Sequence, residues 1–269
     1  MKTIGFIGCG NMAQPIIRNT AEKNVFDKNN IYVYDIDKEK LLEFCKKNEV
    51  NPALNEKKIA SSCDVVVLCT KPQVFPSLLQ ETAEELKKNR PLLVSIAAGK
   101  TTDYIASFLN YDAPVARIFP NLNAEVGEAL SAYTGNAFVS EEQLGTVGRI
   151  CASYGEAKLL PESLFSVFGV LGGCVPAYAF LFMNALAKAG EADGLDADTA
   201  RDVAVQAVLG SAKLLKERGG DMEEWVKKVC SPGGTTIEGV TSLREDGLGE
   251  TVKKAFHKSY LKDLSFREK

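Results

Sequence analysis

The sequence predicts an α/β protein in two parts, a parallel sheet with interleaved helices followed by an all-α segment. Short apolar runs alternate with helical patterns from the N-terminus to about residue 118, which is typical of chains that build parallel sheets. A glycine-rich turn follows the first apolar run, and beyond about residue 159 all patterns are helical. We place the domain boundary there, giving domains of residues 1–160 and 161–269.

Composition restricts the classes of partner. The 269 residues are 45% hydrophobic and 25% charged, enough to bury one large core or two smaller ones. The formal net charge of −3 offers no basic surface for nucleic acid or an anionic membrane. The longest apolar run, residues 168–183, is interrupted by glycines and a proline, so we expect a buried helix and not a membrane span.

Cysteine and histidine usage points to a cytoplasmic protein without a metal site. The seven cysteines form no Cys-x-x-Cys pair and several lie in apolar runs, as reduced core thiols do. The chain enters its first strand directly, without the pattern of a secretion signal. A single histidine, His257, argues against a His-rich metal site and a Ser-His-Asp triad.

The first apolar run, residues 4–8, enters a Gly-x-Gly-x-x-Ala turn that opens a helix over 11–23. In a Rossmann-like dinucleotide-binding domain the first glycine allows a tight turn, the second lets the backbone approach a pyrophosphate, and the small third residue allows close packing. An ordinary strand-to-helix turn is the alternative. The predicted pyrophosphate-binding residues are Gly8, Cys9, Gly10, Asn11, Met12 and Ala13.

The second run, residues 31–35, ends in Asp35 and completes a βαβ unit. A carboxylate about 20 residues beyond the glycine turn binds the adenosine ribose and favours NAD. Lys38 and Lys40 could instead neutralise the extra phosphate of NADP, and Asp35 could simply be a turn residue or the cap of a helix over 38–47. The cofactor is therefore NADPH or NADH.

Three further strands are expected at residues 65–69, 91–96 and 113–118, with helices over 79–88 and 102–109. The loops at their carboxyl ends lie where open α/β sheets bind cofactors, and small residues there suit a flat ligand. Each loop also fits an ordinary turn. The predicted residues are Thr70, Lys71 and Pro72 after the first strand, Ala97, Ala98 and Gly99 after the second, and Asn121 after the third.

The sequence of the C-terminal part predicts six helices. Their wide apolar faces suggest burial against a second chain in an obligate dimer. The expected helices span residues 163–172, 176–194, 197–217, 221–229, 234–245 and 249–266.

One turn in this part, residues 230–236, reads Cys-Ser-Pro-Gly-Gly-Thr-Thr before a helix. Its glycines expose successive N–H groups, which suits an anion such as a substrate carboxylate. A capped helix with a flexible loop is the alternative. The predicted substrate-binding residues are Ser231, Gly233, Gly234, Thr235, Thr236 and, from the first domain, Asn121.

The chain resembles the pyrroline-5-carboxylate reductase family over nearly its whole length. The resemblance rests on the opening Ile-Gly-Phe-Ile-Gly-Cys-Gly-Asn-Met, Thr-Lys-Pro at 70–72, Ser-Ile-Ala-Ala-Gly at 95–99, Pro-Ala-Tyr at 176–178, Gly-Ser-Ala-Lys at 210–213 and above all Val-Cys-Ser-Pro-Gly-Gly-Thr-Thr-Ile-Glu at 229–238.

The resemblance implies reduction of the cyclic imine of 1-pyrroline-5-carboxylate to L-proline by NAD(P)H. It implies that Asn55 lies along the cofactor, that the turn 231–236 holds the substrate carboxylate on its amides, and that the Thr236 hydroxyl lies near the ring nitrogen. Thr236, or a water that it positions, is our candidate proton donor; substrate protonated in solution is the alternative. The resemblance also implies a homodimer through the C-terminal helices, with dimers assembling into rings in some relatives.

Two segments depart from the family pattern, 119–123 and 172–175, where Leu122 and Val175 could narrow the substrate pocket. These departures leave a reductase of another cyclic imine open. A 3-hydroxy acid dehydrogenase would need a catalytic lysine, for which Lys188 is the candidate. A catalytically silent dinucleotide-binding sensor or partner protein is the third hypothesis.

Overall fold

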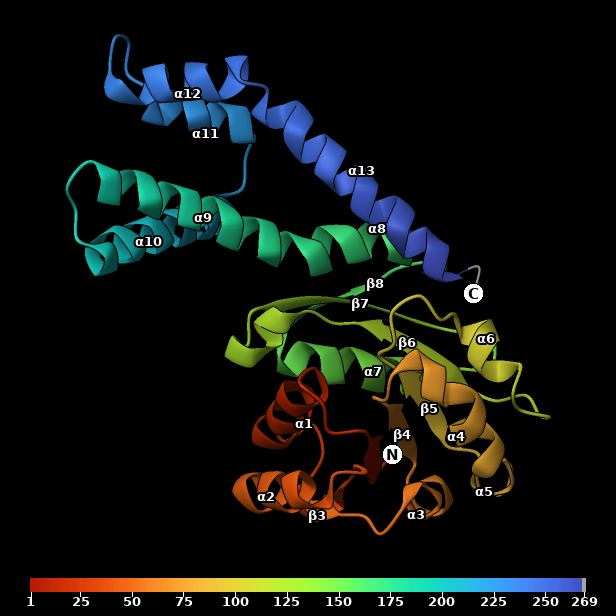
Figure 1. Cartoon of the computed structure of the whole chain (residues 1–269). Helices are drawn as coiled ribbons and strands as arrows, with labels where there is room; N and C mark the ends of the chain where they lie inside the picture. The colour runs from red at the N-terminus through yellow and green to blue at the C-terminus, as the bar shows by residue number, and fades with distance from the viewer. Residues whose placement is uncertain (268–269) are drawn as a thin grey trace. The chain divides into compact units, whose positions relative to one another are not determined.

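A computed structural model describes residues 1–267 and confirms the predicted α/β class (Figure 1). The chain forms two compact units. Unit 1 comprises Met1–Gly173 and the chain from Tyr260, and unit 2 comprises Cys174–Ser259. Units defined by contacts need not coincide with domains, so the division at residue 160 stays a prediction.

Unit 1 contains an eight-stranded sheet with the strand order β3-β2-β1-β4-β5-β6-β7-β8. Neighbouring strands are parallel except β6 and β7, which are antiparallel. The strand order reverses between β1 and β4, which is where ligands bind in open α/β sheets. The strands are β1 (Ile4–Ile7), β2 (Ile31–Tyr34), β3 (Asn51–Pro52), β4 (Val65–Leu68), β5 (Leu92–Ser95), β6 (Val115–Phe119), β7 (Ala129–Gly135) and β8 (Gly155–Leu159).

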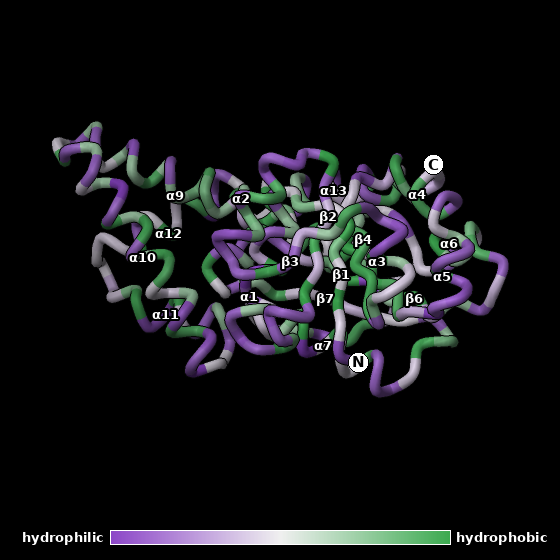
Figure 2. Tube along the Cα trace, turned by 90° about the horizontal axis from the view of Figure 1, so that it is seen from below, coloured by the Kyte–Doolittle hydropathy of each residue, from purple (hydrophilic) through white to green (hydrophobic). Residues whose placement is uncertain are grey.

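Helices cover both faces of this sheet (Figure 1). One core lies under α1, α2 and α7, and the other under α3 to α6. Hydrophobic residues concentrate along the central strands and hydrophilic residues on the outer helices (Figure 2). These helices are α1 (Ala13–Glu22), α2 (Lys38–Asn48), α3 (Glu56–Ser62), α4 (Phe75–Glu81), α5 (Ala83–Asn89), α6 (Thr102–Ala106), α7 (Glu141–Ser153) and α8 (Phe165–Gly169).

The five predicted strands are confirmed, but the sequence analysis missed β3, β7, β8, α3 and α7. The helix expected over 79–88 was wrong, because two helices, α4 and α5, meet at Thr82. A signal for α7 was available: Ser140 and Gln143 form a capping box at its start, and Ser-x-x-Gln is a known helix-start pattern.

The C-terminal helices follow the predicted ranges closely. A π-helical turn, Val170–Cys174, follows α8. The remaining helices are α9 (Val175–Ala192), α10 (Ala197–Arg218), α11 (Met222–Val229), α12 (Thr235–Glu245) and α13 (Leu248–Arg267).

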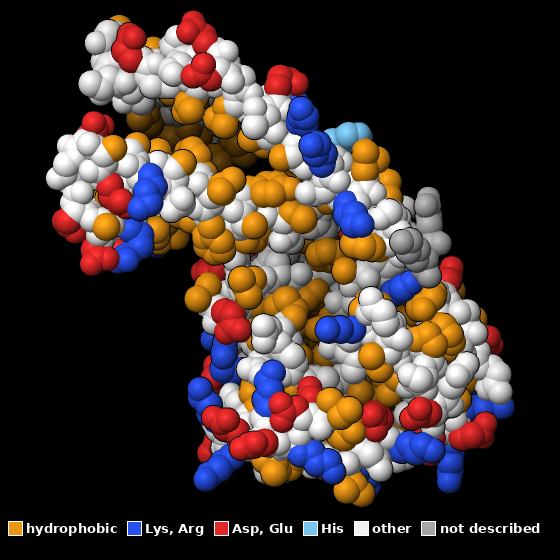
Figure 3. Space-filling model, in the orientation of Figure 1, with side chains coloured by type: hydrophobic (Ala, Val, Ile, Leu, Met, Phe, Trp, Pro, Cys, Tyr) orange, Lys and Arg blue, Asp and Glu red, His pale blue; other side chains and the backbone are white. Residues whose placement is uncertain are grey.

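The prediction that the longest apolar run is buried was wrong for a single chain. Only 22% of the most apolar window in Glu162–Ala192 is buried, and within residues 1–267 this is the one helix long and apolar enough to cross a membrane. Leu181 is 72% exposed and Phe180 57%. Figure 3 shows hydrophobic side chains gathered along α9. A lone helix of this kind is weak evidence for a membrane span, and exposed apolar surface also marks protein interfaces.

Candidate functional site

The glycine turn between β1 and α1 has the backbone geometry that a pyrophosphate site requires. Gly8 has a φ of +106°, and a Cβ there would lie 2.9 Å from the backbone carbon and oxygen of Cys69. A Cβ on Gly10 would meet no atom within 4 Å. Position 8 therefore requires glycine, because of its positive φ and its close packing. Gly10, in contrast, borders open space that a ligand can enter.

The start of α1 carries free hydrogen-bond donors. The helix has no side-chain cap and no acidic residue in its first turn. The Gly10 carbonyl accepts from the N–H groups of Ala13 and Gln14. Across residues 1–267, no acceptor is found for the N–H groups of Gly10, Asn11 and Met12. Uncapped N–H groups at a helix start bind anions, so this turn fits a pyrophosphate.

The Asp35 carboxylate is tied to the glycine turn. Its Oδ2 accepts from the Cys9 N–H at 2.6 Å, and its Oδ1 accepts from the Asp37 N–H at 3.0 Å. Burial, and next the Asp35 carboxylate, raise the pKa of the Cys9 thiol to about 12. The alternative that Asp35 caps the following helix is wrong, because Asp37 caps α2 by accepting from the Lys40 N–H.

A hollow of ≈ 320 Å³ lies at the carboxyl ends of β2 and β3. Asn55, the residue expected along the cofactor, follows β3 and caps α3 by accepting from the Lys58 N–H at 2.9 Å. Its amide nitrogen has no hydrogen-bond acceptor among residues 1–267. The hollow is lined by Tyr34, Lys38, Leu41, Leu42, Pro52, Ala53 and Leu54.

The loops after β4 and β5 border the same edge of the sheet. The Thr70 hydroxyl is buried and has no hydrogen-bond partner in the described part of the chain, and a Cβ on Gly8 would lie 3.1 Å from the Thr70 nitrogen. Lys71 is exposed and precedes the short helix Pro72–Val74. Ala97 and Gly99 are buried, whereas Ala98 is exposed. An unpaired hydroxyl beside the glycine turn fits a polar ligand.

Asn121 has a structural role that the sequence analysis did not foresee. Its side chain is nearly buried; Oδ1 accepts from the Asn123 N–H, and Nδ2 donates to the Gly172 carbonyl at 3.0 Å. Asn121 thereby joins the end of β6 to the π-helical turn. A π turn inside a helix is frequent at functional sites, so Asn121 shapes this segment whether or not it also contacts substrate.

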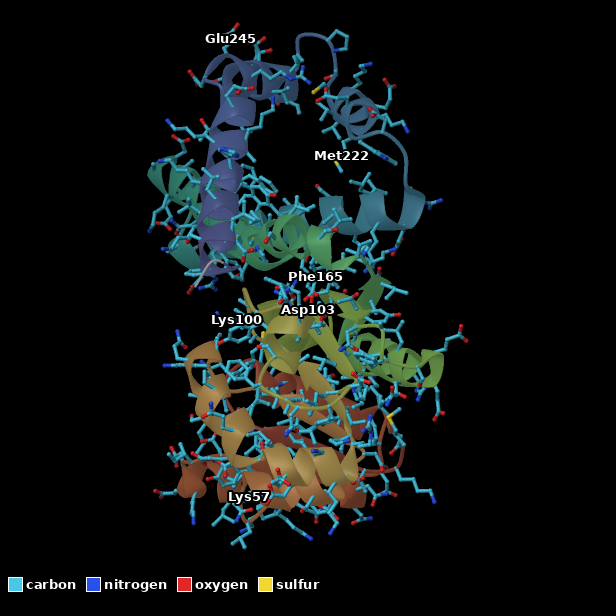
Figure 4. All side chains as sticks on the ribbon, turned by 90° about the vertical axis from the view of Figure 1, so that its right-hand side faces the viewer. Lys57, Lys100, Asp103, Phe165, Met222 and Glu245 are labelled. Atoms are coloured by element: carbon cyan, nitrogen blue, oxygen red, sulfur yellow. The ribbon has the colours of Figure 1, made fainter. Side chains whose placement is uncertain are left out.

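A buried ionic cluster also escaped the sequence analysis. Arg117, 1% exposed, contacts the Glu162 carboxylate at 3.2 Å and lies over the Phe165 ring. Glu162 also accepts from the N–H and hydroxyl of Thr102 at the start of α6. Figure 4 labels Phe165 and Asp103, the neighbours of this cluster on α8 and α6. An arginine in an apolar strand was the available signal, since such a residue requires a buried partner.

The predicted substrate turn lies in unit 2, and one of its amide groups is already engaged within the turn. The Gly234 N–H donates to the Ser231 carbonyl at 3.0 Å, and Gly233 has a φ of +68°. The alternative of a capped helix is wrong, because Gly234 is the cap residue of α12 and no side chain caps it. Thr235 and Thr236 are exposed. The first turn of α12 contains one carboxylate, Glu238, but no side chain caps it, so its N–H groups beyond Gly234 can bind an anion.

The predicted cofactor residues converge on one edge of the sheet. The glycine turn, Asp35, Thr70–Pro72 and Ala97–Gly99 follow β1, β2, β4 and β5, which are neighbouring parallel strands. The substrate turn belongs to the other unit. The specific contacts predicted for these residues, and the formation of one site by the two units, stay predictions.

Comparisons with known proteins extend over the whole chain. Residues 3–99 match the family model described as NADP oxidoreductase coenzyme F420-dependent, and residues 162–265 match pyrroline-5-carboxylate reductase dimerisation. The pyrroline-5-carboxylate reductase of Escherichia coli is 35% identical over 257 residues, covering 96% of this chain and 95% of the relative.

Solved structures agree with this sequence match. A pyrroline-5-carboxylate reductase structure from Coxiella burnetii superposes with a TM-score of 0.92 at 30% identity, covering 98% of both chains. The Plasmodium falciparum pyrroline carboxylate reductase, solved with NADP bound, has a TM-score of 0.89 at 26% identity, covering 99% of this chain and 98% of that one. Because similarity of this extent to the E. coli and C. burnetii proteins spans both units, the chain belongs to the pyrroline-5-carboxylate reductase family.

Proposed function

We propose that this protein reduces the cyclic imine of 1-pyrroline-5-carboxylate to L-proline with NAD(P)H, the last step of proline biosynthesis, in the cytoplasm. Family membership over 96% of the chain supports this activity. In the structure, the proposal rests on two helix starts that no side chain caps. One is the start of α1 after the glycine turn, and the other is the start of α12 after Gly234. A dinucleotide and an imino acid each bring an anionic group that such a helix start can bind.

The residues of unit 1 hold the cofactor. The free N–H groups at Gly10–Met12 receive the pyrophosphate, and Asp35 receives the ribose of the adenosine. The Thr70 hydroxyl, the exposed Lys71 and the half-buried Pro72 border the nucleotide, and Ala97–Gly99 lie beside its flat ring. When bound, NAD(P)H supplies the hydride.

The residues of the turn before α12 hold the imino acid. The N–H groups of Thr235 and Thr236 and the Ser231–Gly234 backbone surround its carboxylate, and the Thr236 hydroxyl lies near the ring nitrogen. Thr236, or a water that it orients, donates the nitrogen proton; substrate protonated in solution is the alternative. A protonated imine is already electrophilic, so orientation and charge complementarity can suffice without a nucleophile. The exposed His257 has no part in this scheme.

The assembled site draws on two subunits. Residues 162–265 match a dimerisation model, and the apolar side chains exposed on α9 and α10 belong to that segment. A homodimer forms through the C-terminal helices, with dimers extending into a ring, and the helical unit of one subunit completes the site on the nucleotide unit of another. An isolated monomer is then inactive.

Lys188 does not support the 3-hydroxy acid dehydrogenase hypothesis. Its side chain is 64% exposed and paired with Glu191 at 2.8 Å, three residues along the same helix. An exposed lysine held in a local surface pair lacks the enclosed surroundings in which a lysine acts as a general acid or base.

Oxidation of NADH and NADPH by the purified protein, followed by their absorbance with and without 1-pyrroline-5-carboxylate, tests the reaction. We expect imine-dependent oxidation, and we expect Thr236→Ala to lower kcat/KM at least about tenfold, as loss of a positioned proton donor does. Thr241→Ala, an exposed threonine later in α12, is the matched control. Unchanged turnover in Thr236→Ala rejects the role of Thr236. Cofactor binding without oxidation of either nucleotide favours another imine or the sensor hypothesis.

A further inference from the structure

We infer that this chain binds NADH in preference to NADPH and that the Asp35 carboxylate determines this specificity. The inference rests on the proposed use of a nicotinamide dinucleotide. It concerns the end of β2, where NAD and NADP differ by a phosphate on the adenosine ribose.

Two backbone donors at the end of β2 are already occupied by Asp35. The N–H groups of Cys9 and Asp37 both donate to its carboxylate, at 2.6 and 3.0 Å. A ribose phosphate placed here would find neither donor free and would face a fixed negative charge. A ribose hydroxyl, in contrast, can donate a hydrogen bond to the same carboxylate.

The start of α2, the other place where a phosphate could bind, is capped by a carboxylate. The Asp37 carboxylate accepts from the Lys40 N–H at 3.1 Å and caps the helix. Glu39 adds a second carboxylate in the first turn. A helix start with one donor used by a carboxylate and a second carboxylate in its first turn attracts an anion less strongly than the uncapped start of α1.

The charges around this end of the sheet sum to a negative value. Residues 35–40 contain three carboxylates, at 35, 37 and 39, and two lysines, at 38 and 40, which leaves a net charge of −1. Burial, and next the Glu56 carboxylate, raise the pKa of Tyr34, so a further acidic group lies near the hollow beside β2.

Lys38 and Lys40 are the competing feature. Both are exposed on the first turn of α2, and Lys38 lines the hollow. An exposed lysine is a flexible and strongly hydrated charge, whereas Asp35 is half-buried and held by two hydrogen bonds. We therefore expect the fixed carboxylate to outweigh the two mobile ammonium groups.

Direct binding measurements test this inference without requiring turnover. Dissociation constants for NADH and NADPH come from the fluorescence of the bound nucleotide, titrated into the full-length protein without imine. We expect NADPH to bind at least about tenfold more weakly, the effect of one close like-charge contact near a protein surface. Equal affinities, or tighter binding of NADPH, overturn the inference.

Two variants assign the preference to Asp35. Asp35→Asn and Asp35→Ser both remove the charge while keeping an oxygen that can accept from the Cys9 N–H, and we expect each to reduce the NADH preference to within about threefold. Asp37→Asn removes the same charge two residues away and is expected to keep the preference. If these variants do not fold, as judged by circular dichroism, the wild-type ratio still decides the preference.

The outcomes separate this inference from the proposed reaction. A clear NADH preference without imine reduction contradicts the reaction and leaves the inference standing. Imine reduction with equal use of both nucleotides supports the reaction and overturns the inference. A preference for NADPH that disappears in the double variant Lys38→Ala, Lys40→Ala assigns the site to the lysines and overturns the inference. A preference for NADH that Asp35→Asn and Asp35→Ser leave intact overturns the role of Asp35.

Discussion

The two glycines of the cofactor turn differ in what a side chain would meet, although both belong to one sequence motif. Gly8→Ala would place a methyl group 2.9 Å from the Cys69 backbone at a φ of +106°, so we expect the free energy of unfolding to fall by about 1–3 kcal/mol. Gly10→Ala meets no protein atom within 4 Å, so stability should change by no more than about 0.5 kcal/mol.

NADH binding should weaken at least about tenfold in Gly10→Ala, because its methyl group would occupy the space where the pyrophosphate approaches the backbone. Urea unfolding and nucleotide fluorescence measure the two quantities separately. A Gly10→Ala protein that is stable and binds NADH normally contradicts the placement of the pyrophosphate.

Asp64 provides a prediction about acid stability. Burial raises the pKa of its carboxyl, but hydrogen bonds from the backbone N–H groups of Lys2 and Thr3 outweigh burial and lower that pKa from its ordinary value of 3.8. A depressed carboxyl pKa stabilises the fold above the unfolded-state value and is lost as pH falls through the folded-state value. We expect stability to fall below about pH 4.

Asp64→Asn should cost about 0.5–1 kcal/mol at neutral pH, because Asp64 is exposed and solvent weakens the hydrogen bonds to its carboxylate, and it should flatten the acid dependence. Urea unfolding across pH measures both effects. Asp112→Asn, which removes an exposed carboxylate in the same unit, is the control. Equal acid sensitivity in wild type and Asp64→Asn contradicts the assignment.

At the scale of elements, the π-helical turn after α8 depends on aromatic packing from β6. A Cβ on Gly169 would lie 2.5 Å from the Phe119 ring, and one on Gly173 would lie 3.0 Å from it. Phe119 also packs edge-on against Phe168. The phenylalanine at position 119 is thus matched by glycines on the facing segment.

Gly169→Ala should therefore destabilise the protein by about 1–3 kcal/mol through overpacking. Phe119→Met supplies a more flexible side chain, so the double variant should recover part of this loss. A double-mutant cycle in urea measures the coupling, which we expect to exceed about 0.5 kcal/mol. Additive effects of the two substitutions would show that they do not share this contact.

Elements with a strong local pattern could be predicted from the sequence, and weakly patterned ones could not. The buried strands β1, β4 and β5 are continuous apolar runs, which identify parallel strands. β8, by contrast, reads Gly-Glu-Ala-Lys-Leu and is mostly exposed, and β3 has two residues. Both exist because a neighbouring strand offers free hydrogen-bonding groups, which is a tertiary effect.

In the candidate site, too, features with a local sequence pattern could be predicted and those set by distant contacts could not. The glycine turn and the Gly-Gly-Thr-Thr turn could be found because backbone geometry requires particular residue types there. The hydrogen-bond partners of Asp35 and Asn121 could not be found in this way. Cys9 lies 26 residues from Asp35 in the chain, and Gly172 lies 51 residues from Asn121. Local sequence does not encode which distant N–H or carbonyl a side chain meets.

At the scale of the whole molecule, exposed apolar helices predict an oligomer. Leu181 on α9 is 72% exposed, and Val203 and Leu209 on α10 are each 56% exposed. These residues lie in the segment that matches a dimerisation model. Burying such side chains against a second chain stabilises the complex by about 25 cal/mol per Å² of apolar surface. A charged side chain placed in that surface would remove this stabilisation and would have to be desolvated.

Leu181→Glu should therefore shift the protein to monomers, with at least about a tenfold loss in the association constant. Light scattering after size-exclusion chromatography over a range of concentrations measures the shift. Phe138→Glu, which places the same charge on an exposed aromatic of unit 1, should leave the assembly intact. If the Leu181→Glu monomers retain NADH binding but lose imine reduction, the shared site is supported; monomers that reduce the imine at the wild-type rate contradict it.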